Sequence, residues 1–222
     1  TNPDTSIPGA NLIAGIGYIS GVKCMIMIDD SGIKAGAASE ATIDKALGCL
    51  DIALKQKLPC VHLVESAGVD LPNYSVKLWS KFGSVFYKKA KLSAAGIPVI
   101  AILHGFSTAG GAYQIGMSDY VIGVKGNGMA ALAGSALLKA ATGENASNSD
   151  IGGVEMHSVV TGSVEYLVYD DAESIITVRK LIDQLNWNEN DAQKTTLNFE
   201  DPEYPIEDLA GIVPTDYSKG YD

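Results

Sequence analysis

Two glycine-containing loops are the parts of this sequence whose residue types suggest chemistry. The first is Ser66–Leu71 (Ser-Ala-Gly-Val-Asp-Leu) and the second is Thr108–Ala112 (Thr-Ala-Gly-Gly-Ala). Small residues let a bound molecule come close to the backbone. Peptide N–H groups that converge from two separate loops form an oxyanion hole, which stabilises a negative oxygen such as that of a thioester enolate.

Each of these loops directly follows a predicted buried strand. Pro59–Glu65 and Pro98–Leu103 are short, continuous apolar runs, which are typical of buried parallel strands. Ligands collect at the carboxyl ends of parallel strands, so both loops should face one crevice. If Gly110 also begins a helix, its N–H is an unpaired donor at the positive end of the helix dipole. Taken alone, the same glycines are explained more simply by tight turns and close packing.

The rest of the chain predicts an α/β fold that alternates strands and helices. Further strands are expected at Asn11–Ser20, Val22–Asp29, Tyr120–Val124 and Val164–Tyr169. Helical spacing of apolar residues predicts long helices over Ser39–Lys55 (with Ser39 as N-cap), Val76–Leu92 and Asp171–Leu185, and short ones over Leu132–Ala141 and Val154–Val160. Strand–loop–helix units in succession imply right-handed crossovers in a mainly parallel sheet. We expect one domain over residues 1–187 and a polar linker or arm over residues 188–222.

Composition narrows the class of partner. A chain of 222 residues with 46% hydrophobic content can bury a substantial core. Its net charge of −10 opposes binding to nucleic acid or an anionic membrane. Cys24, Cys49 and Cys60 have no paired spacing, which indicates reduced thiols in a reducing compartment. The expected partner is therefore a small molecule or another protein.

Five stretches, in order along the chain, resemble one protein family. They are Leu58–Gly68, Thr108–Tyr113, Lys139–Glu144, Ile151–His157 and the helix start at Asp170-Asp171. From Gly15 to about Val213 the sequence resembles the amino-terminal half of the carboxyltransferase (beta) subunit of the methylcrotonoyl-CoA, geranyl-CoA and propionyl-CoA carboxylases. These enzymes belong to the crotonase superfamily. The resemblance implies a crotonase-like (ClpP/crotonase) α/β fold and an acyl-CoA carboxyltransferase half-site.

The resemblance also implies roles for individual residues. The peptide N–H groups of Val69 and Gly110 are the expected catalytic donors, and Ala67, Gly68, Ala109, Gly111 and Tyr113 are the expected substrate-binding residues. In the family, carboxybiotin releases CO₂, the ureido anion takes the α-proton of the acyl-CoA, and the enolate captures the CO₂. The protein supplies positioning and electrostatic stabilisation. Tyr113 either lines the acyl pocket or packs under the loop.

Cofactor and partners follow from the same resemblance. Acyl-CoA is the expected substrate, and no metal is expected. No methionine is followed by lysine, so the biotinylation signature is absent and biotin should arrive on another protein, a biotin carboxyl carrier or biotin carboxylase subunit. The chain stops about where a second carboxyltransferase half would begin, so we expect it to hold half of a site in a homo-oligomer. The expected compartment is the cytoplasm, with the mitochondrial matrix as the alternative.

Two alternative functions stay open on this scaffold. A biotin-dependent acyl-CoA decarboxylase subunit would run the same chemistry in reverse. A non-catalytic acyl-CoA-binding or assembly domain is suggested by Ala67, because the family usually has Ser-Gly-Gly where this chain has Ser66-Ala67-Gly68. Alanine tolerates a positive φ poorly.

Other reactive residue types admit simpler explanations. Lysines at 77, 81, 88, 89 and 91 could attract CoA phosphates, but a solvated helix face explains them. Cys60, His62 and His104 match no usual zinc spacing, and His62 is expected to be a half-buried strand residue. Ser66 and Ser107 lack the G-x-S-x-G elbow of a hydrolase.

Overall fold

The computed structural model describes residues 10–187, 201–212, 214–216 and 218–220. The chain divides into two compact units, Thr1–Glu189 and Asn190–Asp222. In the second unit, the described residues contain a 3-10 turn at Ile206–Asp208 and the helix α8 (Leu209–Ile212). Residues 188–200 of the predicted linker lie outside the described residues, so the linker stays a prediction.

A six-stranded sheet organises the first unit. Its strands, in spatial order, are β1 (Leu12–Ile19), β2 (Val22–Asp29), β3 (Cys60–Val64), β4 (Val99–Leu103), β6 (Tyr120–Val124) and β8 (Tyr166–Val168). Only β1 and β2 pair in an antiparallel manner within this sheet, and every other neighbouring pair is parallel. A mainly parallel α/β sheet is what the sequence predicts.

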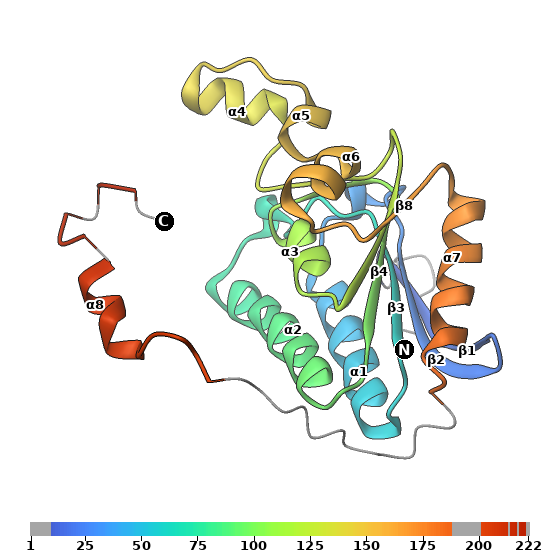
Figure 1. Ribbon diagram of the computed structural model, residues 1–222. Helices are drawn as coiled ribbons and strands as arrows, with labels where there is room; N and C mark the ends of the chain where they lie inside the picture. The colour runs from blue at the N-terminus through green and yellow to red at the C-terminus, as the bar shows by residue number, and fades with distance from the viewer. Residues whose placement is uncertain (1–9, 188–200, 213, 217, 221–222) are drawn as a thin grey trace. The chain divides into compact units, whose positions relative to one another are not determined.

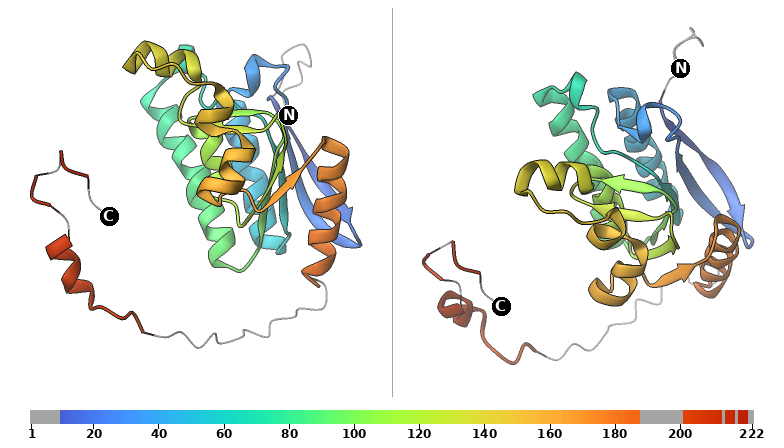
Figure 2. Two further views of the ribbon diagram at one scale, coloured as in Figure 1. Left: turned by 45° about the horizontal axis from the view of Figure 1, so that its top comes forward. Right: turned by 90° about the horizontal axis from the view of Figure 1, so that it is seen from above.

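Helices cover both faces of the sheet. They are α1 (Glu40–Gln56), α2 (Val76–Ala94), α3 (Gly110–Gly116), α4 (Ser135–Thr142), α5 (Asn148–Gly152), α6 (Val154–Met156) and α7 (Asp171–Gln184). Figures 1 and 2 show α1 and α2 side by side on one face and α7 on the opposite face. The sheet is therefore the middle layer, and the two glycine loops lie beyond the carboxyl ends of its strands.

The core follows from the alternation of side chains along each strand. Neighbouring residues in a strand point to opposite faces of a sheet. Cys60 and Val99 pack with the α1 and α2 side chains, including Phe82, whereas Val61 and Ile100 pack with those of α7. Each large aliphatic side chain buried in this way contributes about 1.5–3 kcal/mol relative to exposure.

The ends of the long helices are set by polar caps. Ser39, the predicted N-cap of α1, accepts a hydrogen bond from the amide of Thr42 at 3.3 Å and completes a capping box with Thr42. Ser75 caps α2 by accepting from the amide of Leu78, and Asp170 caps α7 by accepting from the amide of Glu173.

Some predicted boundaries were wrong. A second, two-stranded parallel sheet pairs β5 (Phe106–Thr108) with β7 (Met129–Ala131). Because the chain is still extended at Ala131, α4 starts at Ser135 rather than at Leu132. The single short helix predicted over Val154–Val160 is α6 followed by a π-helical turn at His157–Thr161. Within the described residues, no helix is long and apolar enough to span a bilayer.

Candidate active site

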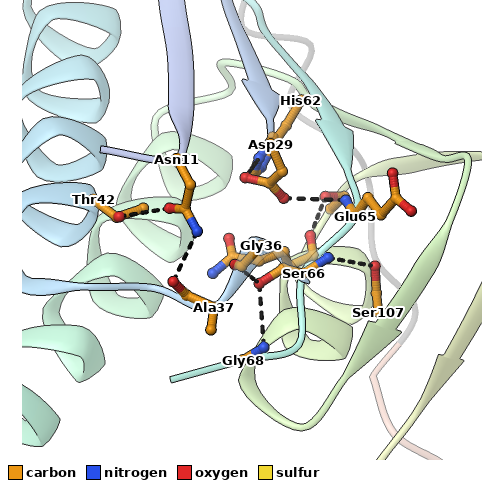
Figure 3. A network of polar contacts seen from close by, with 12 residues as sticks. Asn11, Asp29, Gly36, Ala37, Thr42, His62, Glu65, Ser66, Gly68 and Ser107 are labelled. Atoms are coloured by element: carbon orange, nitrogen blue, oxygen red, sulfur yellow. Dashed lines mark hydrogen bonds and ion pairs between the residues drawn. The ribbon is translucent and has the colours of Figure 1, made fainter. Parts of the chain in front are cut away.

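The first glycine loop leaves the end of β3 and is held against a neighbouring segment. The amide of Ala67 donates to the carbonyl of Ala35 at 3.0 Å. Further along, the amide of Ala38 donates to the carbonyl of Gly68 at 2.6 Å, and the amide of Asp70 donates to the carbonyl of Ala38 at 3.2 Å. Gly68 has φ +90°, a conformation that glycine adopts without steric cost. Residues 35–38 thus brace the loop from one side (Figure 3).

These contacts fix the direction of the Val69 amide. The described residues contain no cis peptide, and in a planar trans peptide the N–H points opposite to the preceding C=O. The carbonyl of Gly68 faces Ala38, so the N–H of Val69 points away from the bracing segment. Among the described residues, no acceptor takes a hydrogen bond from this amide.

The second glycine loop turns from β5 into α3. The amide of Ala109 donates to the carbonyl of Ala131 at 2.9 Å, and Ala109 adopts φ 49° and ψ −119°, which is uncommon for a residue other than glycine. The carbonyl of Ala109 accepts a hydrogen bond from the amide of Tyr113 at 3.4 Å. The N–H of Gly110 therefore points out of the helix start, where the first turn has no internal acceptor.

The two loops touch one another. A Cβ added to Gly68 would lie 3.3 Å from the amide nitrogen of Gly110. The amide of Thr108 donates to the carbonyl of Ser66 at 2.9 Å, and a Cβ added to Gly111 would lie 2.2 Å from that same carbonyl oxygen. At Gly110 a Cβ would meet Phe82 Cε1 at 2.3 Å. The structure thus brings the predicted glycines together, and close packing is part of the reason that they are glycines.

Ala67 does not have the positive φ that its place in the usual Ser-Gly-Gly pattern suggested. Positive φ values in this region fall at Gly68 and Ala109, and Ala67 is not among the residues with positive φ. The loop therefore accommodates Ala67 without the strain that a left-handed alanine would bring. The positive φ falls instead on Ala109, which the sequence analysis names as a substrate-binding residue but not as a strained one.

Tyr113 lies on α3 at the site's edge. Its ring centroid is 5.4 Å from that of Phe86 on α2, so it packs against the helix layer. The side chain is nevertheless 58% exposed. The observed ring contact is therefore with α2, and both packing under the loop and lining the acyl pocket stay predictions.

The lysines of α2 divide into two kinds. Lys77 and Lys81 pair with Glu40 at 3.3 and 3.2 Å, and Lys88 pairs with Asp51 at 2.5 Å, as expected for a solvated face. Lys89 was wrongly grouped with them. It is 0% exposed, and its Nζ donates to the carbonyl of Gln114 at 2.9 Å. Burial lowers the pKa of Lys89 to about 8.

The remaining candidates have structural partners. His62 is buried rather than half-buried, and its Nε2 lies 3.1 Å from Asp29 Oδ1. Burial raises the pKa of the Cys60 thiol to about 12. His104 Nδ1 lies 4.0 Å from Asp171 Oδ1. In the part of the chain that the structure describes, no three His, Cys, Asp or Glu residues gather in a group that could hold a metal ion.

Ser66 and Ser107 are engaged in the loops themselves. The hydroxyl of Ser66 donates to the carbonyl of Gly36 at 2.9 Å and accepts from the amide of Gly68 at 3.2 Å. The hydroxyl of Ser107 accepts from the amide of Ser66 at 3.4 Å. Neither serine is hydrogen-bonded to His104 in the described structure, so the nucleophile–base pair of a hydrolase is not formed.

Sequence reasoning missed the residues that support the first loop. Asp29 Oδ2 accepts a hydrogen bond from the amide of Glu65 at 3.2 Å (Figure 3). Lys34, Ala35 and Gly36 have φ values of 51°, 52° and 71°. Three successive left-handed residues leave no periodic signal, and the only hint in the sequence is the small-residue run from Ala35 to Ala38.

Comparison with known proteins identifies a family for the chain. The sequence profile of the carboxyl transferase domain matches residues 1–222. The methylcrotonoyl-CoA carboxylase beta chain of Dictyostelium discoideum is 39% identical over 97% of this chain, which covers 37% of that protein. A probable biotin-dependent acyl-coenzyme A carboxylase beta2 subunit of Mycobacterium tuberculosis is 40% identical over 96% of this chain, which covers 40% of that protein.

Solved structures give the same result. The geranyl-CoA carboxylase beta subunit of P. aeruginosa superimposes with a TM-score of 0.76 at 41% identity, covering 96% of this chain and 40% of its own. The transcarboxylase 12S crystal structure, a hexamer assembly, gives a TM-score of 0.75 at 28% identity, covering 96% of this chain and 41% of its own. The chain spans about two fifths of these relatives, and the crotonase-like α/β fold expected from the sequence is confirmed. The chain belongs to the carboxyl transferase domain family.

Proposed function

We propose that this chain supplies the acyl-CoA half-site of a biotin-dependent acyl-CoA carboxyltransferase. The observation that carries the proposal is the pair of amides at Val69 and Gly110, which belong to two loops in mutual contact and are without acceptors among the described residues. Two preorganised donors of this kind stabilise the oxyanion of a thioester enolate. The names of the relatives, acyl-CoA carboxylase beta subunits, supply the substrate class and the dependence on biotin.

In this proposal the chain acts through its backbone. Val69 and Gly110 donate to the thioester oxygen, so that negative charge developing there is stabilised as the α-proton leaves. Small side chains around the donors let the thioester reach them; these residues are Ala67, Gly68, Ala109 and Gly111. Tyr113 borders the acyl group with its exposed edge. Biotin, carried on a separate protein, supplies the carboxyl group and the base. The donor chemistry of the two loops fits a carbonyl oxygen and calls for no metal ligand.

The same proposal covers assembly and location. The second half of the site would come from a further carboxyltransferase region, and the chain would act in a homo-oligomer together with a biotin carboxyl carrier or biotin carboxylase subunit. Light scattering on the assembled protein measures the oligomeric state. The compartment would be the cytoplasm or, as in the relatives named mitochondrial, the mitochondrial matrix.

The decisive experiment measures carboxylation by the full natural protein that contains this sequence, assembled with its biotin carboxylase partner. ATP, labelled bicarbonate and a panel of acyl-CoA thioesters are supplied, and transfer of label to a thioester is expected. A parallel reaction with a carboxylated CoA thioester and no ATP detects a decarboxylase. Binding of acyl-CoA with no turnover in either reaction would instead indicate a non-catalytic binding domain.

The donor at Gly110 requires a matched pair of variants. Gly110→Pro removes the N–H, but it also introduces a Cβ against Phe82. Gly110→Ala introduces the same Cβ and keeps the N–H. We expect kcat of Gly110→Pro to be about 10²- to 10³-fold below that of Gly110→Ala, because one oxyanion donor is worth that much. Equal activity of the two variants would exclude Gly110 as a donor.

A further inference from the structure

Ser66 is placed differently from every other residue of the first loop, because its hydroxyl binds two backbone segments at once. It donates to the carbonyl of Gly36 and accepts from the amide of Gly68, at 2.9 and 3.2 Å. The residue is 7% exposed. Both hydrogen-bonding roles of the hydroxyl are therefore used within the protein, and Figure 3 shows it between the bracing segment and the loop.

Backbone contacts hold the loop on both sides of Ser66. Upstream, Asp29 holds the amide of Glu65, and downstream the carbonyl of Gly68 accepts from Ala38. Between these points the chain has to turn so that the carbonyl of Gly68 faces Ala38 and the N–H of Val69 points away from it. The Ser66 hydroxyl binds the amide N–H of Gly68, while Ala38 binds the carbonyl of Gly68. The peptide groups on both sides of the Gly68 α-carbon are therefore held in place.

Ser66 also connects the first loop to the second through its backbone. Its amide donates to Ser107 Oγ at 3.4 Å, and its carbonyl accepts from the amide of Thr108 at 2.9 Å. The same carbonyl lies where a side chain on Gly111 would have to be. A rotation at Ser66 would consequently move the two donor loops relative to each other.

We propose that Ser66 is a positioning residue of the oxyanion site, which holds the Val69 amide in register with that of Gly110 without touching the substrate. The inference rests on the proposed function. It predicts that removing the hydroxyl lowers transition-state stabilisation more than substrate binding, since donors displaced by about 1 Å can cost up to about 100-fold in rate.

The first test is Ser66→Ala in the assembled enzyme. We expect kcat to fall about 10- to 100-fold while KM for the acyl-CoA changes less than about 3-fold. Ser174→Ala is the matched control, because Ser174 is 1% exposed and its hydroxyl also bonds to a backbone carbonyl, that of Asp171, at 2.7 Å. It lies on α7, and its loss should leave kcat unchanged.

A second measurement keeps the inference testable if Ser66→Ala does not fold. Amide hydrogen exchange of the wild-type protein reports the Gly68 amide, which should be protected by the Ser66 hydroxyl, whereas the Val69 amide should exchange faster because it has no protein acceptor. In a folded Ser66→Ala protein, exchange at Gly68 should accelerate at least about 10-fold.

The outcomes separate the inference from the proposed function. If the wild-type protein showed no carboxylation activity, the proposed function would be wrong. Amide hydrogen exchange at Gly68 would still report whether Ser66 holds the loop. If the wild-type enzyme is active, a Ser66→Ala kcat within 3-fold of wild type overturns the inference. So does a raised KM at unchanged kcat, or a Gly68 amide in the wild type that exchanges as freely as an unprotected one.

Discussion

The carbonyl oxygen of Ser66 lies where a side chain on Gly111 would have to be, 2.2 Å from the position of an added Cβ. Ser66 belongs to the loop after β3 and Gly111 to the first turn of α3, so this contact joins the two loops that carry the proposed donors. The space is closed by backbone rather than by a flexible side chain, and it cannot open without moving a loop.

We therefore expect Gly111→Ala to destabilise the protein by about 1–3 kcal/mol, the usual cost of overpacking, and to lower kcat as well. Gly116→Ala, in the same helix, is the control. A Cβ there meets nothing within 4 Å, so this change should be neutral or stabilise by up to about 1 kcal/mol. Urea unfolding and steady-state kinetics measure both effects. A Gly111→Ala protein as stable and active as wild type would show that the loops separate easily.

The alanine at position 67, where the family usually has glycine, should affect neither activity nor stability strongly. Because Ala67 does not have a positive φ, Ala67→Gly, which restores the Ser-Gly-Gly pattern, is expected to keep kcat within about 3-fold and to cost no more than about 1 kcal/mol of stability. Gly68→Ala is the contrasting change. Its φ of +90° and the carbonyl of Thr108 at 3.1 Å from an added Cβ predict a loss of about 1–2 kcal/mol. The reverse order of the two effects in urea unfolding would contradict the backbone geometry.

The capping box of α1 can be tested independently of activity. Ser39→Ala removes the acceptor of the Thr42 amide, and we expect the free energy of unfolding to fall by about 1 kcal/mol. Ser80→Ala, at an exposed position inside α2, should be neutral or slightly stabilising because alanine is the better helix former. Thermal unfolding of the two variants together gives the comparison, and an equal shift in both would argue against the cap.

Much of this fold could be predicted from the sequence, because most of its elements are periodic. The continuous apolar runs of β3 and β4 and the 3.6-residue spacing of α1, α2 and α7 appear directly as apolar patterns. β5 and β7 have three residues each, too few for any period. They exist because the ends of β4 and β6 place them next to each other, which is a tertiary effect.

The candidate site was predictable in part for the same reason. Glycines at 68, 110 and 111 follow predicted strands, so their meeting at one sheet edge could be deduced from topology. The bracing segment could not be predicted, because left-handed residues such as Ala35 and Gly36 are set by long-range contacts rather than by side-chain pattern. The burial of Lys89 was missed because its neighbours Lys88 and Lys91 on α2 are lysines that reach solvent or acidic partners.

Lys89 gives the protein a predicted pH dependence of stability. Burial lowers its pKa from the ordinary 10.5 to about 8, with Cys60, Asp29 and Asp119 acting in the opposite direction. Below pH 8 the lysine is charged in both states, and the folded state bears the full cost of burying that charge. Between pH 8 and 10.5 the unfolded state holds more protons than the folded state, so this residue makes the free energy of unfolding rise with pH.

Lys89→Met should remove that slope. The carbonyl of Gln114 keeps the hydrogen bond from the Ser118 hydroxyl at 2.8 Å, so the loss of the ammonium leaves it a partner. We expect the variant to be at least as stable as wild type at pH 7, because a buried charge is replaced by an apolar group of similar length.

Lys91→Met is the control, since Lys91 is exposed and lies over the ring of Tyr87. Urea unfolding at pH 7 and pH 9.5 should show wild type and Lys91→Met gaining stability in parallel, and Lys89→Met lacking that gain. If Lys89→Met kept the full gain in stability between pH 7 and pH 9.5, the pH dependence would come from another group.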